Sequence, residues 1–346
     1  MTPTVAVVLV NYNGLADTRQ CLRSLSALTY PRWFPVVVDN ASRDDPTPII
    51  TTEFPGCPVL RNPVNGGWAG GNNVGIDFAR KHHADYVILL NNDTTVAPEL
   101  IDRLVATALA NPGYGVLGPV IRHFDPPHDV QTDGCTFNAP GRPEFFQRLP
   151  VRLERRATPA VTEVDIVNGC CLMVATPVFR KIGRIDEKFF LIHEESDFCL
   201  RARAAGFHCG VIGEALVWHK GSQSFRRSGL RVQRYFDARN LLLLLSKHGY
   251  LPGPRRGRVA SLVAYMKYAY ARYEFEQTAG CDDAATAVLE GVCDAVARRF
   301  GPHRLRSRPV LPLLRRLFEF RRVRAGLEFR VSIARVSSPV RLGAMT

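Results

Sequence analysis

The segment Tyr86-Val-Ile-Leu-Leu-Asn-Asn-Asp93 passes from a short apolar run directly into three polar side chains. A run of this length with β-branched residues is typical of a buried strand in a parallel sheet. The same pattern occurs twice upstream, where Val5 to Val10 precedes Asn11-Tyr-Asn-Gly14 and Pro35 to Val38 precedes Asp39-Asn-Ala-Ser42. The sequence therefore predicts three strands that each end in polar residues.

Helix-like segments lie between these strands, at Asp17 to Leu28 and Trp68 to His82, and another follows the last strand at Pro98 to Ala110. Alternation of strands and helices predicts an α/β fold, with a mainly parallel, Rossmann-like sheet and helices on both faces. Ligands of such sheets bind at the carboxyl ends of the strands. We therefore expect the three polar clusters to converge on one site.

The second half of the chain has a different pattern. Residues 121 to 160 are rich in Pro, Arg and Asp and predict a long loop or an irregular hairpin. A strand is predicted at Val161 to Val167, and helices at Thr176 to Ile182 and Glu194 to Ala205, the latter stopping at Gly206. Beyond residue 226 the pattern is helical. We expect a nucleotide-binding and catalytic domain over 1–225 and a helical, basic region over 226–346.

The charge of the chain is concentrated in this last region. The formal net charge is +13, yet residues 1–224 hold 21 Lys+Arg against 23 Asp+Glu, and residues 225–346 hold 24 against 9. Arginines interleaved with apolar residues from Leu313 to Arg324 favour a helix on an anionic membrane surface. No nucleic-acid recognition motif accompanies them, so no nucleic-acid partner is expected. A solvated helical face is the alternative.

The compartment can be predicted from three features. No apolar run approaches the roughly 18 residues that a spanning helix needs. No charged leader precedes the first apolar segment, and the nine cysteines include no CxxC pair. We expect a cytoplasmic protein, with peripheral attachment to the inner face of the membrane as a further expectation.

Two acidic residues at strand ends are candidates for ligand binding. Asp39 ends an apolar strand, where a carboxylate needs a partner, and the imide N–H of uracil or thymine would supply one. Asp93 stands where a hard divalent cation could find an oxygen ligand beside a diphosphate. The alternatives are a turn or helix-cap aspartate for Asp39 and a polar turn for Asp93.

The segment Asn65-Gly-Gly-Trp-Ala-Gly-Gly-Asn-Asn73 combines glycines with amide side chains at the start of a helix. Such a loop suits close backbone contact with a ligand and an anion near a helix N-terminus. Its spacing fits neither a GxGxxG fingerprint nor a phosphate loop of the GxxxxGK type. The alternative is a glycine turn that packs tightly on a strand.

The segment His193-Glu-Glu-Ser-Asp-Phe-Cys-Leu-Arg201 carries several acids at helical spacing. Asp197 and Arg201 can pair at i,i+4, whereas Glu195 points to another side and is a candidate general base. A charged, solvent-facing helix start is the alternative. His219, after the apolar run Ala215 to Val217, is either a metal ligand or a satisfied core residue.

Taken together and in order, these pieces resemble family 2 glycosyltransferases of the GT-A fold, especially the branch similar to rhamnosyl- and galactofuranosyl-transferases. The matching stretches are Val8 to Gly14, Val36 to Ser42, Asn65 to Gly75, Leu89 to Thr94, Ile185 to Phe190, Glu194 to Arg201 and Trp218-His219.

The resemblance implies a role for each matching residue. Glu195 would be the catalytic base, and Asp93 and His219 would bind Mg2+ or Mn2+. The supporting residues would be Glu194, Asp197, Arg201 and Arg239. The nucleotide-binding residues would be Asn11, Asn13, Asp39, Asn65, Gly66, Gly67, Asn72 and Asn91. Two positions depart from the family pattern, because Asn91 replaces an acid and Glu195 is one methylene longer than the usual aspartate.

The resemblance also implies the reaction. A sugar would pass with inversion from a UDP- or dTDP-linked donor to a hydroxyl of a glycan or lipid-linked acceptor in cell-envelope synthesis. One alternative is a nucleotidyltransferase, although the Arg/Lys phosphate loop typical of that class is missing near the first strand. The other is a catalytically inactive, membrane-associated binding protein of the same fold.

Overall fold

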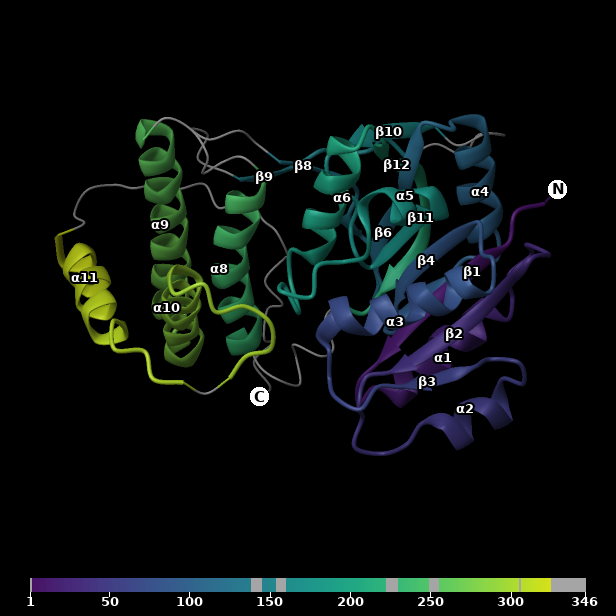
Figure 1. Cartoon of the computed structure of the whole chain (residues 1–346), viewed down its shortest axis with the longest axis horizontal. Helices are drawn as coiled ribbons and strands as arrows, with labels where there is room; N and C mark the ends of the chain where they lie inside the picture. Colours follow the sequence, from purple (N-terminus) through teal and green to yellow (C-terminus); the bar gives the residue numbers. More distant parts are fainter. Residues whose placement is uncertain are drawn as a thin grey trace.

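The computed structural model describes residues 2–137, 145–153, 160–221, 230–248, 255–304 and 306–324. Figure 1 shows a twisted sheet flanked by helices, and beside it a layer of helices formed by the C-terminal part of the chain.

One half of the ten-stranded sheet is parallel. Its strands lie in the order β3 (Val59–Arg61), β2 (Trp33–Asp39), β1 (Val5–Asn11) and β4 (Tyr86–Asn91). Pairing runs from Val5 opposite Trp33 to Asn11 opposite Asp39, so β1 and β2 end level with each other. The polar residues that follow the strands therefore share one edge of the sheet, as the sequence predicts.

The other half is mixed. β11 (Cys171–Ala175) lies antiparallel between β4 and β6 (Tyr114–His123), and β12 (His208–His219) runs parallel to β6. Three short strands complete the sheet: β5 (Thr94–Val96), β7 (Val130–Thr132) and β10 (Val161–Val164). The predicted α/β sheet is confirmed, although the sequence did not predict the reversal at β11.

Helices cover both faces of the sheet, as predicted. Val5, Val7 and Leu9 of β1 pack with α1 (Leu15–Leu25), α2 (Thr47–Glu53) and α4 (Leu100–Ala110). Ala6 and Val8, which point the other way because side chains alternate along a strand, pack with α3 (Gly67–Lys81), α5 (Thr176–Ile182) and α6 (Glu194–Ala204).

Glycines allow α3 to approach β1 and the loop before α6. A Cβ on Gly75 would lie 2.2 Å from Val8 Cγ1. Gly67, at the start of the helix, has φ +70°, and a Cβ there would lie 2.3 Å from the carbonyl oxygen of Phe190. Only glycine fits these positions without a shift of the backbone.

The predicted irregular hairpin of residues 121–160 contains β7 and a separate pair, β8 (Cys135–Phe137) with β9 (Phe146–Arg148). The helical prediction beyond residue 226 is confirmed by α8 (Leu230–Lys247), α9 (Arg255–Thr278), α10 (Asp282–Val296) and α11 (Leu311–Arg324). The sequence Pro252-Gly-Pro254 also predicts a break within this helical region, and it lies outside the described residues. Within the described part of the chain, none of the helices has the length and apolar character required to cross a bilayer.

Candidate active site

The ends of β1 and β2 are joined by side-chain hydrogen bonds. Asn11 Nδ2 donates to Asp39 Oδ1 at 2.9 Å and to Ser42 Oγ at 3.1 Å, and Thr18 Oγ1 donates to Asn11 Oδ1 at 2.9 Å. The backbone N–H of Asn13 donates to the same Ser42 hydroxyl at 2.8 Å. The amides and the carboxylate thus fix one another at the edge where the parallel strands end.

Asp39 is fully buried, and its charge is compensated inside the protein. Besides Asn11, it accepts from the backbone N–H of Ser42 and from Arg61 Nε, both at 3.2 Å. Arg61 lies opposite Asp39 at the end of β3. The sequence analysis missed Arg61. Its place directly after the apolar residues Val59 and Leu60 could have marked it as another polar residue at a strand end. Contact of Asp39 with a nucleobase stays a prediction.

The glycine loop is attached to the end of β2 by Asn40, which the sequence analysis also missed. Asn40 Nδ2 donates to Asn65 Oδ1 and to the carbonyl oxygen of Gly67, both at 2.9 Å, and its Oδ1 accepts from the N–H of Gly66 at 3.0 Å. Asn65, Gly66 and Gly67 therefore lie beside the Asp39 cluster. The Asn72 amide does not join them, because its Nδ2 donates to the carbonyl oxygen of Trp68 within α3.

Asp93 and His219 meet because β5 pairs with the end of β12. His219 Nε2 lies 3.1 Å from Asp93 Oδ1, and both side chains are about nine-tenths buried. His219 Nδ1 lies 2.7 Å from Gln131 Oε1, and since a carbonyl oxygen only accepts, Nδ1 carries the proton. In this tautomer Nε2, which makes no hydrogen bond within the described part of the chain, presents a lone pair to the carboxylate.

This arrangement fits a divalent cation. Two buried atoms that both carry lone pairs face each other, and a cation can satisfy both. Within the described ranges, no third His, Cys, Asp or Glu joins them in a metal-binding group. Asp93 and His219 can therefore supply only part of a coordination shell, and phosphate oxygens and water would have to complete it. Gln131, which orients the imidazole, had no signal in the sequence.

Glu195 lies close to the end of β4. Asn91 Oδ1 accepts from Trp68 Nε1 at 3.0 Å. Gly169 stands beside both the indole and Glu195, since a Cβ on this glycine would lie 3.3 Å from Trp68 Cζ2 and 3.3 Å from Glu195 Cβ. Glu195 is partly exposed, and Ser196 Oγ donates to its Oε1 at 3.3 Å. A carboxylate that solvent can reach thus lies near the strand-end residues.

Glu194 has a different environment from its neighbour. Its side chain is buried, and its Oε2 makes no hydrogen bond to any residue that the structure describes. Burial, together with the charge of Glu195, raises the pKa of Glu194 well above its ordinary value. The protonated form of Glu194 is therefore favoured, which makes it a poorer proton acceptor than Glu195.

The predicted pair between Asp197 and Arg201 is confirmed, with Arg201 Nε 2.8 Å from Asp197 Oδ2. Asp197 Oδ1 also contacts His248 Nε2 at 2.9 Å and Lys247 Nζ at 2.8 Å. Burial alone would raise the pKa of Asp197, but the hydrogen bond from His248 and the charges of Arg201 and Lys247 lower it to about 2. Asp197 therefore anchors α6 to the end of α8.

The loop before α6 has an unusual backbone. Phe190, Ile192 and His193 have φ values of 65°, 68° and 72°, in the left-handed region that non-glycine residues rarely adopt. Each such residue costs about 1–3 kcal/mol and persists only where the surroundings hold it. The three lie directly before Glu194 and Glu195.

Two residues of α8 hold this loop. Asn240 Nδ2 donates to the carbonyl oxygens of Phe189, Leu191 and Ile192 at 2.6–2.8 Å. Arg239 is fully buried, and its guanidinium donates to the carbonyl oxygens of Lys188, Phe189 and Gly301. We call Arg239 and Asn240 the α8 clamp. The sequence analysis named Arg239 as a supporting residue but did not predict these bonds.

His193 is held from two further sides. Its Nε2 lies 3.1 Å from Asp237 Oδ1, and its ring stacks on Phe146 at 5.1 Å between centroids. Burial would raise the pKa of Asp237, but the hydrogen bond from His193 and the charge of Arg272 lower it to about 2. The β8–β9 hairpin, the start of α6 and α8 are thus joined at His193, the residue that precedes Glu194.

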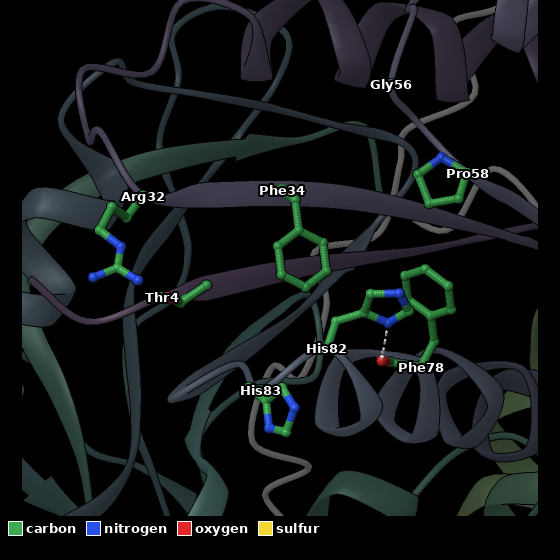
Figure 2. Close-up of a pocket in the computed structure, with 8 residues that line it drawn as sticks. All are labelled: Thr4, Arg32, Phe34, Gly56, Pro58, Phe78, His82 and His83. Carbon is green, nitrogen blue, oxygen red and sulfur yellow. Dashed lines mark hydrogen bonds between the residues drawn. The ribbon is translucent and has the colours of Figure 1, made fainter.

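A separate hollow of about 530 Å³ lies near the opposite edge of the sheet (Figure 2). Thr4, before β1, and Phe34, at the start of β2, form part of its lining, and His82 stacks on Phe78 with 4.0 Å between ring centroids. None of the residues that line it belongs to the predicted site. The hollow is therefore distinct from the strand-end cluster.

A sheet with amides, a carboxylate and an acid–imidazole pair at its strand ends is the arrangement expected of a glycosyltransferase that uses nucleotide-sugar donors. Residues 6–180 match the model of the family described as "Glycosyl transferase family 2". The chain belongs to this family, which sets aside the nucleotidyltransferase alternative.

Three curated relatives are 26–28% identical to the chain over the aligned residues. The low-salt glycan biosynthesis hexosyltransferase Agl10 of Haloferax volcanii is 28% identical over 247 residues, which are 70% of this chain and 76% of that protein. The N-acetylglucosaminyl-diphospho-decaprenol L-rhamnosyltransferase of Mycobacterium tuberculosis is 26% identical over 291 residues, 79% of this chain and 94% of that protein. The dTDP-rhamnosyl transferase RfbF of Shigella flexneri is 26% identical over 259 residues, which are 72% of this chain and 82% of that protein.

Two solved structures share the fold at low identity. GalNAc-T7, crystallised with UDP, GalNAc and Mn2+, aligns with a TM-score of 0.53 and 16% identity over 80% of this chain and 58% of that chain. The mannosyltransferase PcManGT from Pyrobaculum calidifontis, in complex with GDP-Man and Mn2+, aligns with a TM-score of 0.50 and 14% identity. The alignment covers 86% of this chain and 88% of that chain. They support the GT-A-like fold of this chain.

Proposed function

We propose that this chain transfers a hexosyl or deoxyhexosyl group, with inversion, from a UDP- or dTDP-linked donor to a hydroxyl of a lipid-linked or envelope glycan. The observation that carries the proposal is the place of Glu195, which lies across Gly169 from the indole that hydrogen-bonds Asn91 at the end of β4. A solvent-accessible carboxylate is thus near the predicted donor site. The names of two relatives, one a dTDP-rhamnosyl transferase and one a transferase for a decaprenol-linked diphosphate, support the donor and acceptor classes.

Asp93 and His219 are proposed to hold Mg2+ or Mn2+ through Asp93 Oδ1 and His219 Nε2. When bound, the cation would neutralise the leaving diphosphate. Mn2+ in two solved structures of the same fold supports this choice. Gln131 keeps the imidazole in the tautomer that frees Nε2.

Glu195 is proposed to accept the proton of the acceptor hydroxyl while the hydroxyl oxygen forms the new bond at the anomeric carbon. The bond to the diphosphate breaks in the same displacement, so the anomeric configuration inverts. Glu194 is a poorer candidate for this role, because burial and its neighbour favour its protonated form.

The test uses purified protein with a panel of UDP- and dTDP-sugars and a lipid-diphosphate sugar acceptor. Glu195→Gln should lower turnover by about 10²–10⁴-fold and leave donor affinity nearly unchanged, because only the proton acceptor is lost. Glu194→Gln is the matched control and should have a smaller effect. A larger effect of Glu194→Gln would exchange their roles, and a product with retained configuration would overturn the single displacement.

A further inference from the structure

Helix α11 has a buried apolar side and, on another side, large apolar residues that stay more than half exposed. Leu314 and Phe318 are buried, and the Phe318 ring meets Tyr270 and Tyr273 of α9 edge-on at 5.4 and 5.5 Å. Leu313, Leu317 and Phe320 are 69%, 52% and 57% exposed. Large apolar side chains that gather on a surface mark a contact site more often than scattered ones do.

The exposed residues form a stripe with a cation inside it. Leu313, Leu317 and Phe320 follow at i, i+4 and i+7, which places them along one side of a helix. Arg316 is exposed and lies three residues after Leu313 and four before Phe320, so it belongs to the same side. We call Leu313, Arg316, Leu317 and Phe320 the outer stripe.

The positive charge of the C-terminal sequence favours an anionic partner. The sequence of α11 holds five arginines and one glutamate, and residues 225–346 carry a net charge of +15. An apolar stripe on an arginine-rich helix is typical of helices that lie in the interface of an anionic bilayer. In Figure 1, α11 lies on the side of the helical layer that faces away from the sheet, so a surface could reach it without covering the strand ends.

We propose that the outer stripe of α11 docks the protein on an anionic lipid bilayer, with Leu313, Leu317 and Phe320 entering the headgroup region and Arg316 contacting lipid phosphates. The choice of a bilayer rests on the proposed function, since a lipid-linked acceptor lies in a membrane. Docking would bring the enzyme to its acceptor without a spanning helix.

The test measures co-sedimentation of the full chain with vesicles of phosphatidylcholine alone or mixed with phosphatidylglycerol. The wild-type protein should bind the mixed vesicles and be released as salt rises, because salt screens the attraction between basic groups and anionic lipids. Replacing Leu313, Leu317 and Phe320 together by Ser should weaken binding at least about tenfold. Arg316→Glu should weaken binding and reduce its salt dependence.

Leu109→Ser is the matched control, because Leu109 is 61% exposed on α4, far from the stripe in sequence. This variant should bind as the wild type does. Equal binding of the wild type to both kinds of vesicle, or unchanged binding of the triple variant and of Arg316→Glu, would overturn the proposal. Light scattering that shows a dimer for the wild type and a monomer for the triple variant would also overturn the proposal, because the outer stripe would then be an interface between two copies of the chain.

Activity assays separate this proposal from the proposed function. The triple variant should keep its turnover on a short-chain, water-soluble acceptor and lose it on the same acceptor placed in vesicles. Vesicle binding by a wild type that transfers no sugar would contradict the proposed function alone. Transfer in vesicles that the triple variant performs equally well would contradict the docking alone.

Discussion

The strand ends and the loop before α6 carry the two sets of predicted site residues on backbones of different kinds. Asn11 and Asp39 sit on regular parallel strands, level with each other, and bond to near neighbours in the sheet. Glu194 and Glu195 follow three left-handed residues that depend on side chains of α8. The predicted donor half of the site is thus built by sheet geometry, whereas the loop before the proposed base, Glu195, is held by side chains of α8, which is distant in sequence.

This difference predicts how mutations in each half should affect activity and stability. A change at a strand end should remove chemistry and leave the fold intact, because the strands are held by their own ladders. A change in the α8 clamp or its surroundings should displace the base and cost stability at the same time. Four variants test this contrast, in order of decreasing effect.

Asp93→Asn should lower turnover by about 10²–10³-fold, the loss typical when a group that stabilises leaving charge is removed. Its melting temperature should stay near that of the wild type. Steady-state rates with a Mn2+ titration and a thermal melt measure both quantities, and Asp77→Asn, on the exposed face of α3, is the matched control. Full wild-type turnover in excess chelator would remove the metal from the mechanism.

Asp197→Asn should destabilise the protein by about 3–5 kcal/mol at pH 7, because Arg201, Lys247 and His248 lose their buried counter-charge. The lowered pKa of Asp197, about 2, means that its stabilisation is present above its ordinary pKa and is lost as pH falls from about 4 to about 2. Denaturant melts across this window should therefore show a shallower acid decline in the variant.

The control for Asp197→Asn is Glu163→Gln, which removes a half-exposed acid paired with Arg203 and should change stability by less than about 1 kcal/mol. Equal effects of the two variants would mean that the contacts of Asp197 with α8 do not anchor α6.

Asn240→Ala should lower kcat by about 10–100-fold, an effect comparable to that of misplacing a catalytic group by about 1 Å. Three carbonyl oxygens of the loop lose the hydrogen bond from Asn240, although Phe189 keeps the one from Arg239. The strand ends are untouched, so the affinity for the sugar donor should change little. Ser246→Ala, which removes a hydrogen bond within α8 alone, is the control. A variant that loses donor affinity but keeps kcat would show that the clamp does not position Glu195.

Glu194→Gln should have the smallest effect and the opposite sign. Because the folded pKa of Glu194 is raised, its favourable contribution is present below its ordinary pKa and is lost as pH rises through the folded value. The glutamine stays neutral, so the variant should match the wild type near pH 4 and melt a few degrees higher near pH 8. A lower melting temperature at pH 8 would mean that the ionised carboxylate is stabilised in the fold.

The sequence predicted the residues at the strand ends better than the contacts that hold the loop before α6. The polar ends of β1, β2 and β4 and the pairing of Asp197 with Arg201 depend on residues close in sequence or on strand alternation, so local patterns sufficed. The bond from Gln131 to His219 spans 88 positions and the bond from Asn240 to Phe189 spans 51. No periodicity marks such contacts, since they exist only after the sheet and α8 have packed.

The α8 clamp limits how this chain can be recombined with its relatives. The family match ends at residue 180. It therefore stops before Glu195, the proposed base, and before α8, the helix that holds the loop in front of α6. A chimera that joins residues 1–225 of this chain to the helices of another family member would receive a foreign side chain at each clamp position. Unless that side chain also donates to the carbonyl oxygens of residues 189, 191 and 192, the hybrid should recognise its donor and turn over slowly. We therefore expect that an exchange of the C-terminal helices between family members keeps turnover only when α6 and α8 are exchanged together.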